Sequence, residues 1–482
     1  MKVEFTNISQ KTSANTKIFS EFQKSPPAFS NLSSQNFTKV EKFARANRMW
    51  RQILILGIGG SSLPPRTLIS ALAKKNSPEF FFLDNLDAEK NAHIFEKLDW
   101  KKTLVIVITK SGETLETIAN FFVVKQKLGK NWRKQVVAVT DPDSGFLRKL
   151  ATHEKFTAFE ILQRVGGRFS IFSNAGLLPA ALAGVNLRKL LEGTASAETK
   201  KAFEFAKIHA AEFRRGKNIS TFCVYSNALE SFAKWWEQLL AESIGKNYRV
   251  GITPEIAIGA TDQHSKLQLW QDGPNDKFFI FTRVINSATN FKIPNPSNEF
   301  QFLRGKSMQQ ILHAEFEATV KSLAEKKRAL ATFEILRINE FEIGRLLQFW
   351  MLEVYFLGKI LEVNPLDQPG VERGKILARK LLSRNGKKRI FLGRFRSREK
   401  ENLSLSKYFQ RNFAHIFRTR NFRSDGFFSF FKIFTTSFSR ENFASRGDSF
   451  FRGNSNECGE SRVAEFTKYF RGKSATSRAR KF

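Results

Sequence analysis

Residues 105–117 read Val-Ile-Val-Ile-Thr-Lys-Ser-Gly-Glu-Thr-Leu-Glu-Thr, a short apolar run that leads directly into a loop rich in hydroxyl groups. The β-branched run predicts a strand that is covered on both faces. Thr109, Ser111 and Thr114 then surround one glycine, just before an amphipathic stretch over 115–128 that predicts a helix. A helix start presents unpaired N–H groups and a positive dipole end, so it favours an anion. The loop is either an ordinary helix cap or a phosphate site, and this stretch alone does not decide between them.

Strand-like and helix-like stretches alternate along the chain on both sides of this junction. Short apolar strands are expected at 53–56, 80–84, 104–109 and 136–140, and again at 220–225, 278–284 and 333–338. Helical patterns lie between them, at 64–75, 115–128, 227–243, 308–327 and 342–362. This alternation predicts an α/β protein with two doubly wound parallel sheets, whose ligands bind at the carboxyl ends of the strands.

The composition along the chain predicts five parts. An N-terminal arm covers residues 1–45, of which residues 6–38 are expected to have limited structure of their own, and the first α/β subdomain covers 46–190. A helical connection over 191–217 leads into the second subdomain, 218–382. A basic tail, 383–482, follows.

The bulk properties fit a soluble protein. A chain of 482 residues with 41% hydrophobic and 26% charged residues can form several domains. Residues 1–10 lack the apolar core of a secretory signal, and the apolar stretches 174–185 and 349–363 are too short or too charged to cross a bilayer. Two distant cysteines give neither a disulfide framework nor a metal spacing, so we expect a reducing, cytoplasmic setting.

The tail accounts for much of an unusual composition. The chain has a net charge of +34 and 51 phenylalanines. From Ser383 onward there are 24 lysine and arginine residues against 8 aspartate and glutamate residues, and 18 of the phenylalanines. No period of 2 or 3.6 persists there, so no packed core is expected. We favour an aberrant extension, such as a shift of reading frame; the alternative is a genuine basic arm that binds RNA.

Two glycine-containing motifs are candidates for ligand contact. Gly57-Ile-Gly-Gly-Ser61-Ser62 follows a strand and precedes a helix, but it lacks the spacing of a dinucleotide site and indicates only a possible anion-binding turn. Arg168 lies in Val165-Gly-Gly-Arg-Phe-Ser170, where two glycines allow the backbone to approach a ligand. The apolar, small residues that follow argue against a freely solvated arginine.

Further candidates carry acid–base groups. Gln238 and Glu242 are four residues apart on a predicted helix and therefore share one face. A carboxylate in the last helical turn opposes the dipole, which suits a general base better than a stabilising group, although solvated helix glutamates are commoner. His264 lies in a polar segment predicted as a loop, where a lone histidine is usually inert. Lys375 ends Asp367-Gln-Pro-Gly-Val-Glu-Arg-Gly-Lys375, whose turn leads into a helix.

These motifs, in this order, resemble those of the phosphoglucose isomerase (glucose-6-phosphate isomerase) family from about residue 51 to residue 382. The family fold consists of two sugar-isomerase (SIS) subdomains, in agreement with the two α/β units. Phe169 and Leu366 stand where other aromatic residues are common in the family. Family sequences end soon after the lysine helix, so the tail has no counterpart.

The resemblance implies an aldose–ketose isomerase of glycolysis and gluconeogenesis that needs neither metal nor cofactor. The implied phosphate-binding residues are Gly60, Ser61, Thr109, Lys110, Ser111 and Thr114, and the implied substrate-binding residues are Gln238 and Gln368. Glu242 would move a proton between C2 and C1, and Arg168 would stabilise the enediolate. His264 and Lys375 would open the sugar ring. Family members are usually dimers in which the histidine segment enters the partner's site.

Two alternatives differ in function. The first is another isomerase of the superfamily, acting on mannose or amino-sugar phosphates. The second is a regulator that senses a sugar phosphate through an SIS module and binds nucleic acid through the tail. A regulator should lack the base, yet Glu242, His264 and Lys375 are all present. We therefore favour the isomerase.

Overall fold

The computed structural model describes residues 2–9, 16–34, 36–161 and 164–383. The chain divides into a compact unit, Met1–Arg379, and a second unit, Lys380–Phe482. The described residues of the first unit form two five-stranded sheets. Apart from Ser383, the predicted basic tail lies outside the described residues, and so does its proposed contact with nucleic acid.

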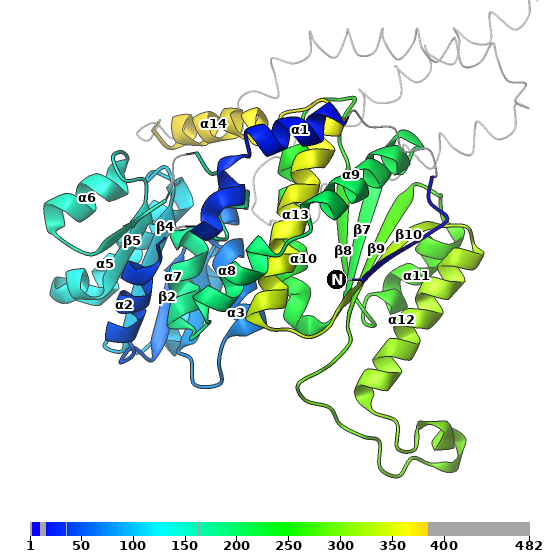
Figure 1. Cartoon of the computed structure of the whole chain (residues 1–482). Coiled ribbons are helices and arrows are strands. Elements are labelled where there is room, and N and C mark those ends of the chain that lie inside the picture. Colours follow the sequence, from blue (N-terminus) through cyan, green and yellow to red (C-terminus); the bar gives the residue numbers. More distant parts are fainter. Residues whose placement is uncertain (1, 10–15, 35, 162–163, 384–482) are drawn as a thin grey trace, which may run out of the picture. The chain divides into compact units, whose positions relative to one another are not determined.

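The first sheet is entirely parallel, as predicted. Its strand order is β3-β2-β4-β5-β6. Figure 1 labels β2, β4 and β5 of this sheet. The strands are β2 (Gln52–Leu56), β3 (Glu79–Leu83), β4 (Thr103–Thr109), β5 (Val136–Thr140) and β6 (Ala158–Glu160). Every residue of β4 is buried, which explains its uninterrupted apolar sequence. The sequence did not predict β6, a three-residue edge strand.

The second sheet has the order β1-β10-β9-β7-β8. Its parallel strands are β7 (Ile219–Tyr225), β8 (Thr253–Ile258), β9 (Lys277–Val284) and β10 (Ala329–Ile335). The strand predicted at 333–338 therefore begins four residues earlier, and β8 was not predicted. At one edge, β1 (Lys2–Thr6) pairs antiparallel with β10, so this sheet is mixed.

The prediction that the N-terminal arm has limited structure of its own is wrong. Besides β1, it forms α1 (Lys17–Lys24), the 3₁₀ segment η1 (Ala28–Ser34) and α2 (Thr38–Ala46). Phe29 is buried, and its ring stacks on Phe169 with the centroids 4.6 Å apart. The apolar residues of the arm are too sparse for a core of their own, but they pack against elements that lie later in the chain.

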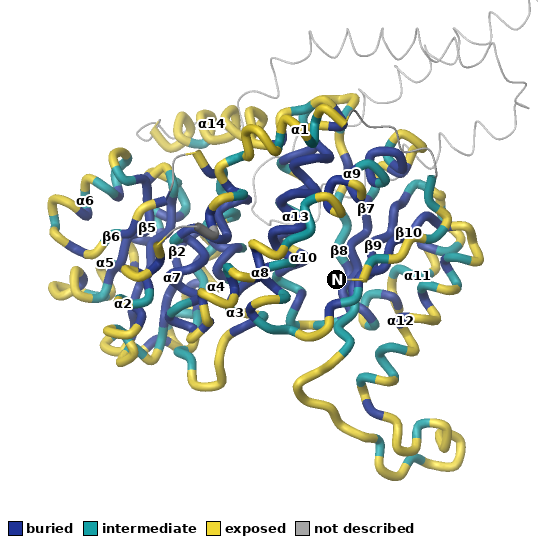
Figure 2. The backbone as a smooth tube through the Cα atoms, viewed as in Figure 1, coloured by how far each residue is buried: buried dark blue, intermediate teal, exposed yellow. Residues whose placement is uncertain are grey.

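Helices cover both faces of each sheet. The helices that follow the arm are α3 (Leu63–Leu72), α4 (Ala88–Lys97), α5 (Leu115–Leu128), α6 (Phe146–Glu154), α7 (Asn174–Leu182), α8 (Leu187–Ala195), α9 (Thr199–Arg214), α10 (Glu230–Ile244), α11 (Gln263–Asp272), α12 (Met308–Glu325) and α13 (Glu340–Ile360). The last described helix, α14 (Glu372–Ser383), has no buried residue. Figure 2 shows α13 buried along most of its length, and it packs against α8, α9 and α10. Among the described residues, no helix combines the length and the apolar character that a membrane crossing requires.

Alternating residues of the strands enter different hydrophobic clusters. Ile53 of β2 and Phe278 of β9 belong to one large cluster, so the two sheets share a core. Leu54, the next residue of β2, points to the opposite face of the first sheet and packs beneath α5 and α6. Phe279, the next residue of β9, points to the opposite face of the second sheet and packs beneath α11 and α12. This shared core fixes the carboxyl ends of strands from both sheets relative to α10, where the candidate site lies.

Candidate active site

The hydroxyl-rich loop connects the end of β4 to the start of α5. Thr114 occupies the N-cap position of α5, but its side chain makes no capping hydrogen bond. Its hydroxyl instead lies 2.8 Å from the hydroxyl of Thr109, and Ser111 Oγ accepts a hydrogen bond from the Glu113 N–H. Gly112 has a φ of +67°, which a residue with a side chain rarely adopts. The loop gathers hydroxyl groups rather than capping the helix, and this arrangement favours the phosphate-site interpretation.

Lys110 connects this loop to the arginine motif. Its ammonium donates a 3.0 Å hydrogen bond to the carbonyl of Val165. Burial lowers the pKa of Lys110, and the nearby charge of Asp141 opposes that shift. A partly desolvated cation beside hydroxyl groups is well suited to bind a phosphoryl group.

The glycine turn packs directly against the arginine motif. Gly60 and Ser61 lie in the 3₁₀ segment η2 (Gly59–Ser61). A Cβ atom on Gly60 would lie 2.4 Å from the carbonyl carbon of Gly167, so only glycine fits there. On the other side, a Cβ atom on Gly59 would lie 3.0 Å from Gln238 Nε2. The glycines therefore allow three segments that are distant in sequence to converge.

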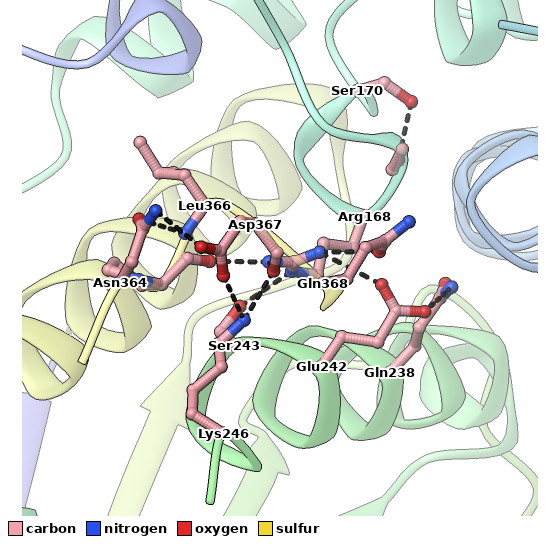
Figure 3. Close-up of polar contacts among 12 residues, drawn as sticks. Arg168, Ser170, Gln238, Glu242, Ser243, Lys246, Asn364, Leu366, Asp367 and Gln368 are labelled. Atoms are coloured by element: carbon pink, nitrogen blue, oxygen red, sulfur yellow. Dashed lines mark hydrogen bonds and ion pairs between the residues drawn. The ribbon is translucent and has the colours of Figure 1, made fainter. Parts of the chain in front are cut away.

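Arg168 lies at the centre of the site, and its side chain is only 1% exposed. Its guanidinium uses all five N–H groups within the protein (Figure 3). Nε donates to Ser243 Oγ (2.8 Å), Nη1 to Glu242 Oε2 (3.1 Å) and Gln368 Oε1 (2.9 Å), and Nη2 to the carbonyls of Pro365 (2.6 Å) and Asp367 (2.8 Å). Burial lowers the pKa of Arg168, whereas the charge of Glu242 raises it. The predicted exclusion of this arginine from solvent is confirmed.

Glu242 lies in the last turn of α10, with both carboxylate oxygens hydrogen-bonded. Oε2 contacts Arg168, and Oε1 accepts a 2.7 Å hydrogen bond from Gln238 Nε2, which confirms that the two side chains share one helix face. The Glu242 side chain remains 26% exposed. Among the described residues, Gln238 Oε1 is buried and has no hydrogen-bond partner. The site thus offers an oriented carboxylate and an unused acceptor side by side.

The sequence did not identify the contacts that hold residues 364–368 against α10. Lys246 binds both the main-chain carbonyl and the carboxylate of Asp367, and Asn364 Nδ2 donates to the same carboxylate at 2.8 Å. The neighbouring Gln368 reaches Arg168. The Gly-Lys pair after Glu242 and the Asp-Gln pair were visible in the sequence, but nothing in it indicated that Lys246 and Asp367 meet.

Residues 33–397 match the family model described as phosphoglucose isomerase. The chain belongs to the phosphoglucose isomerase family. A glucose-6-phosphate isomerase from Carboxydothermus hydrogenoformans is 36% identical over 389 residues, which cover 74% of this chain and 84% of that protein. A glucose-6-phosphate isomerase from Thermus thermophilus is 37% identical over 368 residues, or 73% of this chain and 88% of that protein.

Solved structures show the same fold. A hypothetical protein from Thermus thermophilus superposes with a TM-score of 0.70 at 34% identity, covering 76% of this chain and 93% of that one. A glucose-6-phosphate isomerase from Chlamydia trachomatis has a TM-score of 0.63 at 23% identity, covering 78% of this chain and 76% of that one. The first resemblance extends to the sequence, and the second concerns the fold alone.

The two residues that the family resemblance assigns to ring opening lie apart from the Arg168–Glu242 pair. His264 is exposed in the first turn of α11, not in a loop as predicted. Lys375 is exposed on α14, where its ammonium pairs with Glu372 at 2.7 Å. Among the described residues, neither side chain contacts Arg168 or Glu242. The same part of the chain holds no group of three or more His, Cys, Asp or Glu side chains placed to bind a metal.

Proposed function

We propose that this chain interconverts glucose 6-phosphate and fructose 6-phosphate by proton transfer through an enediolate. The observation that carries the proposal is the Glu242 carboxylate, which Arg168 and Gln238 orient while part of it stays exposed. Removing a proton next to a carbonyl group requires such a positioned base and a cation near the developing negative charge. Relatives named glucose-6-phosphate isomerase support the same reaction.

The phosphate group of the substrate is proposed to bind in the hydroxyl-rich loop. Its ligands would be Gly60, Ser61, Thr109, Lys110, Ser111 and Thr114. The mutual hydrogen bond of Thr109 and Thr114, and the cation of Lys110, support this assignment. The loop binds the end of the sugar that does not react, and this leaves C1 and C2 to meet Glu242.

Glu242 is the proposed base. With glucose 6-phosphate in its open form, Glu242 takes the proton from C2, and the electron pair forms the C1–C2 double bond of the enediolate. A proton then moves from the O2 hydroxyl to O1, and return of the abstracted proton to C1 gives fructose 6-phosphate, with its carbonyl group at C2. Gln238, through its unused Oε1, and Gln368 are proposed to bind sugar hydroxyls.

Arg168 is proposed to stabilise the enediolate through its charge. All five of its N–H groups already have acceptors, so a direct hydrogen bond to the substrate requires the release of one of them. Asp367 and Gln368 are the exposed members of that set, and Gln368 is the simpler to exchange because its acceptor is a side-chain oxygen, whereas that of Asp367 is a main-chain carbonyl. The same contacts keep the carboxylate of Glu242 oriented before the substrate arrives.

Ring opening is assigned to His264 and Lys375, with His264 supplied by the partner in a homodimer. The exposure of His264 supports this arrangement. The segment from the end of β9 to the first residue of α12 also carries exposed apolar side chains that an interface between two copies would cover, namely Phe291, Phe300, Phe302 and Met308. We further propose a cytoplasmic location, which the sparse use of cysteine supports.

A coupled assay of fructose 6-phosphate turnover by the full chain tests the function. Glu242→Gln is expected to lower kcat by about 10²- to 10⁴-fold, the usual share of a general base. Its Kd for fructose 6-phosphate, measured by calorimetry, should stay near the wild-type value. Glu237→Gln, on the same helix, is the matched control and should keep wild-type kcat. Wild-type turnover in the Glu242→Gln chain would refute the assignment.

A further inference from the structure

We infer that Lys246 is a positioning residue for the isomerisation, because it fixes residues 364–368 and thereby orients Gln368 and Arg168 toward Glu242. The inference rests on the proposed function. The site contains a base, its cation and a substrate-binding amide, but these come from segments far apart in sequence. Lys246, two residues after the end of α10, ties the last of these segments to that helix.

The contacts of Lys246 converge on a single residue. Its ammonium binds the main-chain carbonyl of Asp367 and lies 3.0 Å from Asp367 Oδ1. The same carbonyl accepts a 2.8 Å hydrogen bond from Arg168 Nη2, so two cations share one acceptor. The Asp367 carboxylate offsets their repulsion. Figure 3 shows this arrangement next to Gln368 and Glu242.

Residues 364–368 need such a tether because they lie in neither a helix nor a strand. Asn364 Oδ1 accepts a hydrogen bond from the Leu366 N–H, and Asn364 Nδ2 donates to Asp367 Oδ2. These bonds fix the internal shape of the segment. Its attachment to the rest of the site depends on Arg168 and on Lys246, which contact the carbonyl of Asp367 from two directions.

A purely structural ion pair is the alternative, and the burial of Lys246 weighs against it. The Lys246 side chain is 9% exposed, whereas that of Asp367 is 51% exposed. An ion pair with a carboxylate that is half exposed contributes little to stability. The attraction of Asp367 alone therefore does not offset the cost of removing the Lys246 side chain from solvent. Burial lowers the pKa of Lys246, and the hydrogen bond to Asp367 raises it. A partly desolvated cation that lies this close to the Arg168–Glu242 pair is better explained by a role in the site.

The chain offers a matched control. Lys217 is buried, and like Lys246 it binds both the main-chain carbonyl and the side-chain oxygen of one loop residue, Asn275. Neither residue contacts Arg168 or Glu242 in the described part of the chain. Lys217→Met therefore removes an equivalent tether away from the site.

Steady-state kinetics of the full chain form the first test. Lys246→Met is expected to lower kcat/KM about 10- to 100-fold, mainly through kcat, because the base and its partners lose their alignment. Lys246→Arg should keep most of the wild-type kcat/KM, and Lys217→Met should leave kcat/KM unchanged. Adding Asp367→Asn to Lys246→Met should cost little more than either change alone. A kcat/KM for Lys246→Met within twofold of wild type would overturn the inference.

Hydrogen exchange separates this inference from the proposed function. Peptides that cover residues 361–371 should exchange faster in Lys246→Met than in wild type or in Lys217→Met. If the wild-type chain turns over no sugar phosphate, the proposed function fails. The exchange rate of residues 361–371 in Lys246→Met, compared with that in wild type, still decides whether Lys246 holds the segment. Equal exchange in all three chains would overturn the positioning role.

Discussion

Replacing Arg168 by lysine keeps the positive charge of the site but removes its geometry. The guanidinium supplies five N–H groups to five acceptors, and an ammonium has only three. At least two acceptors must therefore lose their partner. The bonds to Ser243 and to the carbonyl of Pro365 are buried, so water does not readily replace them.

The magnitude follows from these unpaired acceptors. Each buried acceptor left without a donor costs about 1–3 kcal/mol. Two such acceptors lower the free energy of unfolding by about 2–6 kcal/mol. Because Gln368 is exposed and water can replace its lost donor, we expect a value of about 2–4 kcal/mol. Because Glu242 also loses a fixed partner, kcat/KM should fall about 10²-fold.

Urea unfolding and steady-state kinetics on the same preparations test this prediction. Arg328→Lys is the control, since Arg328 is also buried but, among the described residues, its side chain donates only to the carbonyls of Gln271 and Gly273, and an ammonium can serve both. That change should cost about 1 kcal/mol or less. If Arg168→Lys matches the control in the free energy of unfolding and keeps wild-type kcat/KM, the central role of the five contacts is refuted.

Gly60→Ala should lower both the melting temperature and kcat/KM, because its Cβ atom would lie 2.4 Å from Gly167; a chain with wild-type melting and kinetics would contradict this close packing. Burial lowers the pKa of Lys110, so the folded chain releases this proton at a lower pH than the unfolded chain does. The KM for fructose 6-phosphate should therefore rise in the alkaline range, below the ordinary lysine pKa, while the contribution of Lys110 to the free energy of unfolding increases with pH over the same window. Lys110→Arg should move the rise in KM to higher pH, and a flat profile in the wild type would exclude Lys110 from phosphate binding. Mixing and reassociating equal amounts of His264→Gln and Glu242→Gln chains should restore about a quarter of wild-type activity if His264 acts across a dimer, since half of the dimers would be mixed and each would hold one intact site. No recovery in the mixture would assign His264 to its own chain.

The sequence predicted the elements whose burial is uniform. β4 is apolar throughout because both of its faces are covered, and α5 begins and ends where the amphipathic pattern does. The strands that the sequence did not predict lie where burial is partial. β8 reads Thr-Pro-Glu-Ile-Ala-Ile at a sheet edge, and β1 joins the opposite edge through pairing with β10. Such strands depend on partners distant in the chain, and a local pattern does not reveal these partners.

The candidate site shows the same division. The spacing of Gln238 and Glu242 places them on one helix face, and the structure confirms their contact. The contact of Lys246 with Asp367 joins residues 121 positions apart, and the fold alone creates it. The sequence also could not predict that all five N–H groups of Arg168 are used. Two of their acceptors are main-chain carbonyls, which every residue type has, so no residue type in the sequence marks them.

The central claim is that Glu242 moves a proton between C2 and C1 of a hexose 6-phosphate. Proton NMR of glucose 6-phosphate in D₂O, with the full chain and with Glu242→Gln in parallel, tests it most directly. The wild-type chain should form fructose 6-phosphate, with solvent deuterium incorporated at C1 and C2, and Glu242→Gln should give neither product nor deuterium incorporation. A wild-type chain that binds the sugar phosphate without converting it, or a Glu242→Gln chain that exchanges deuterium at the wild-type rate, would contradict the claim.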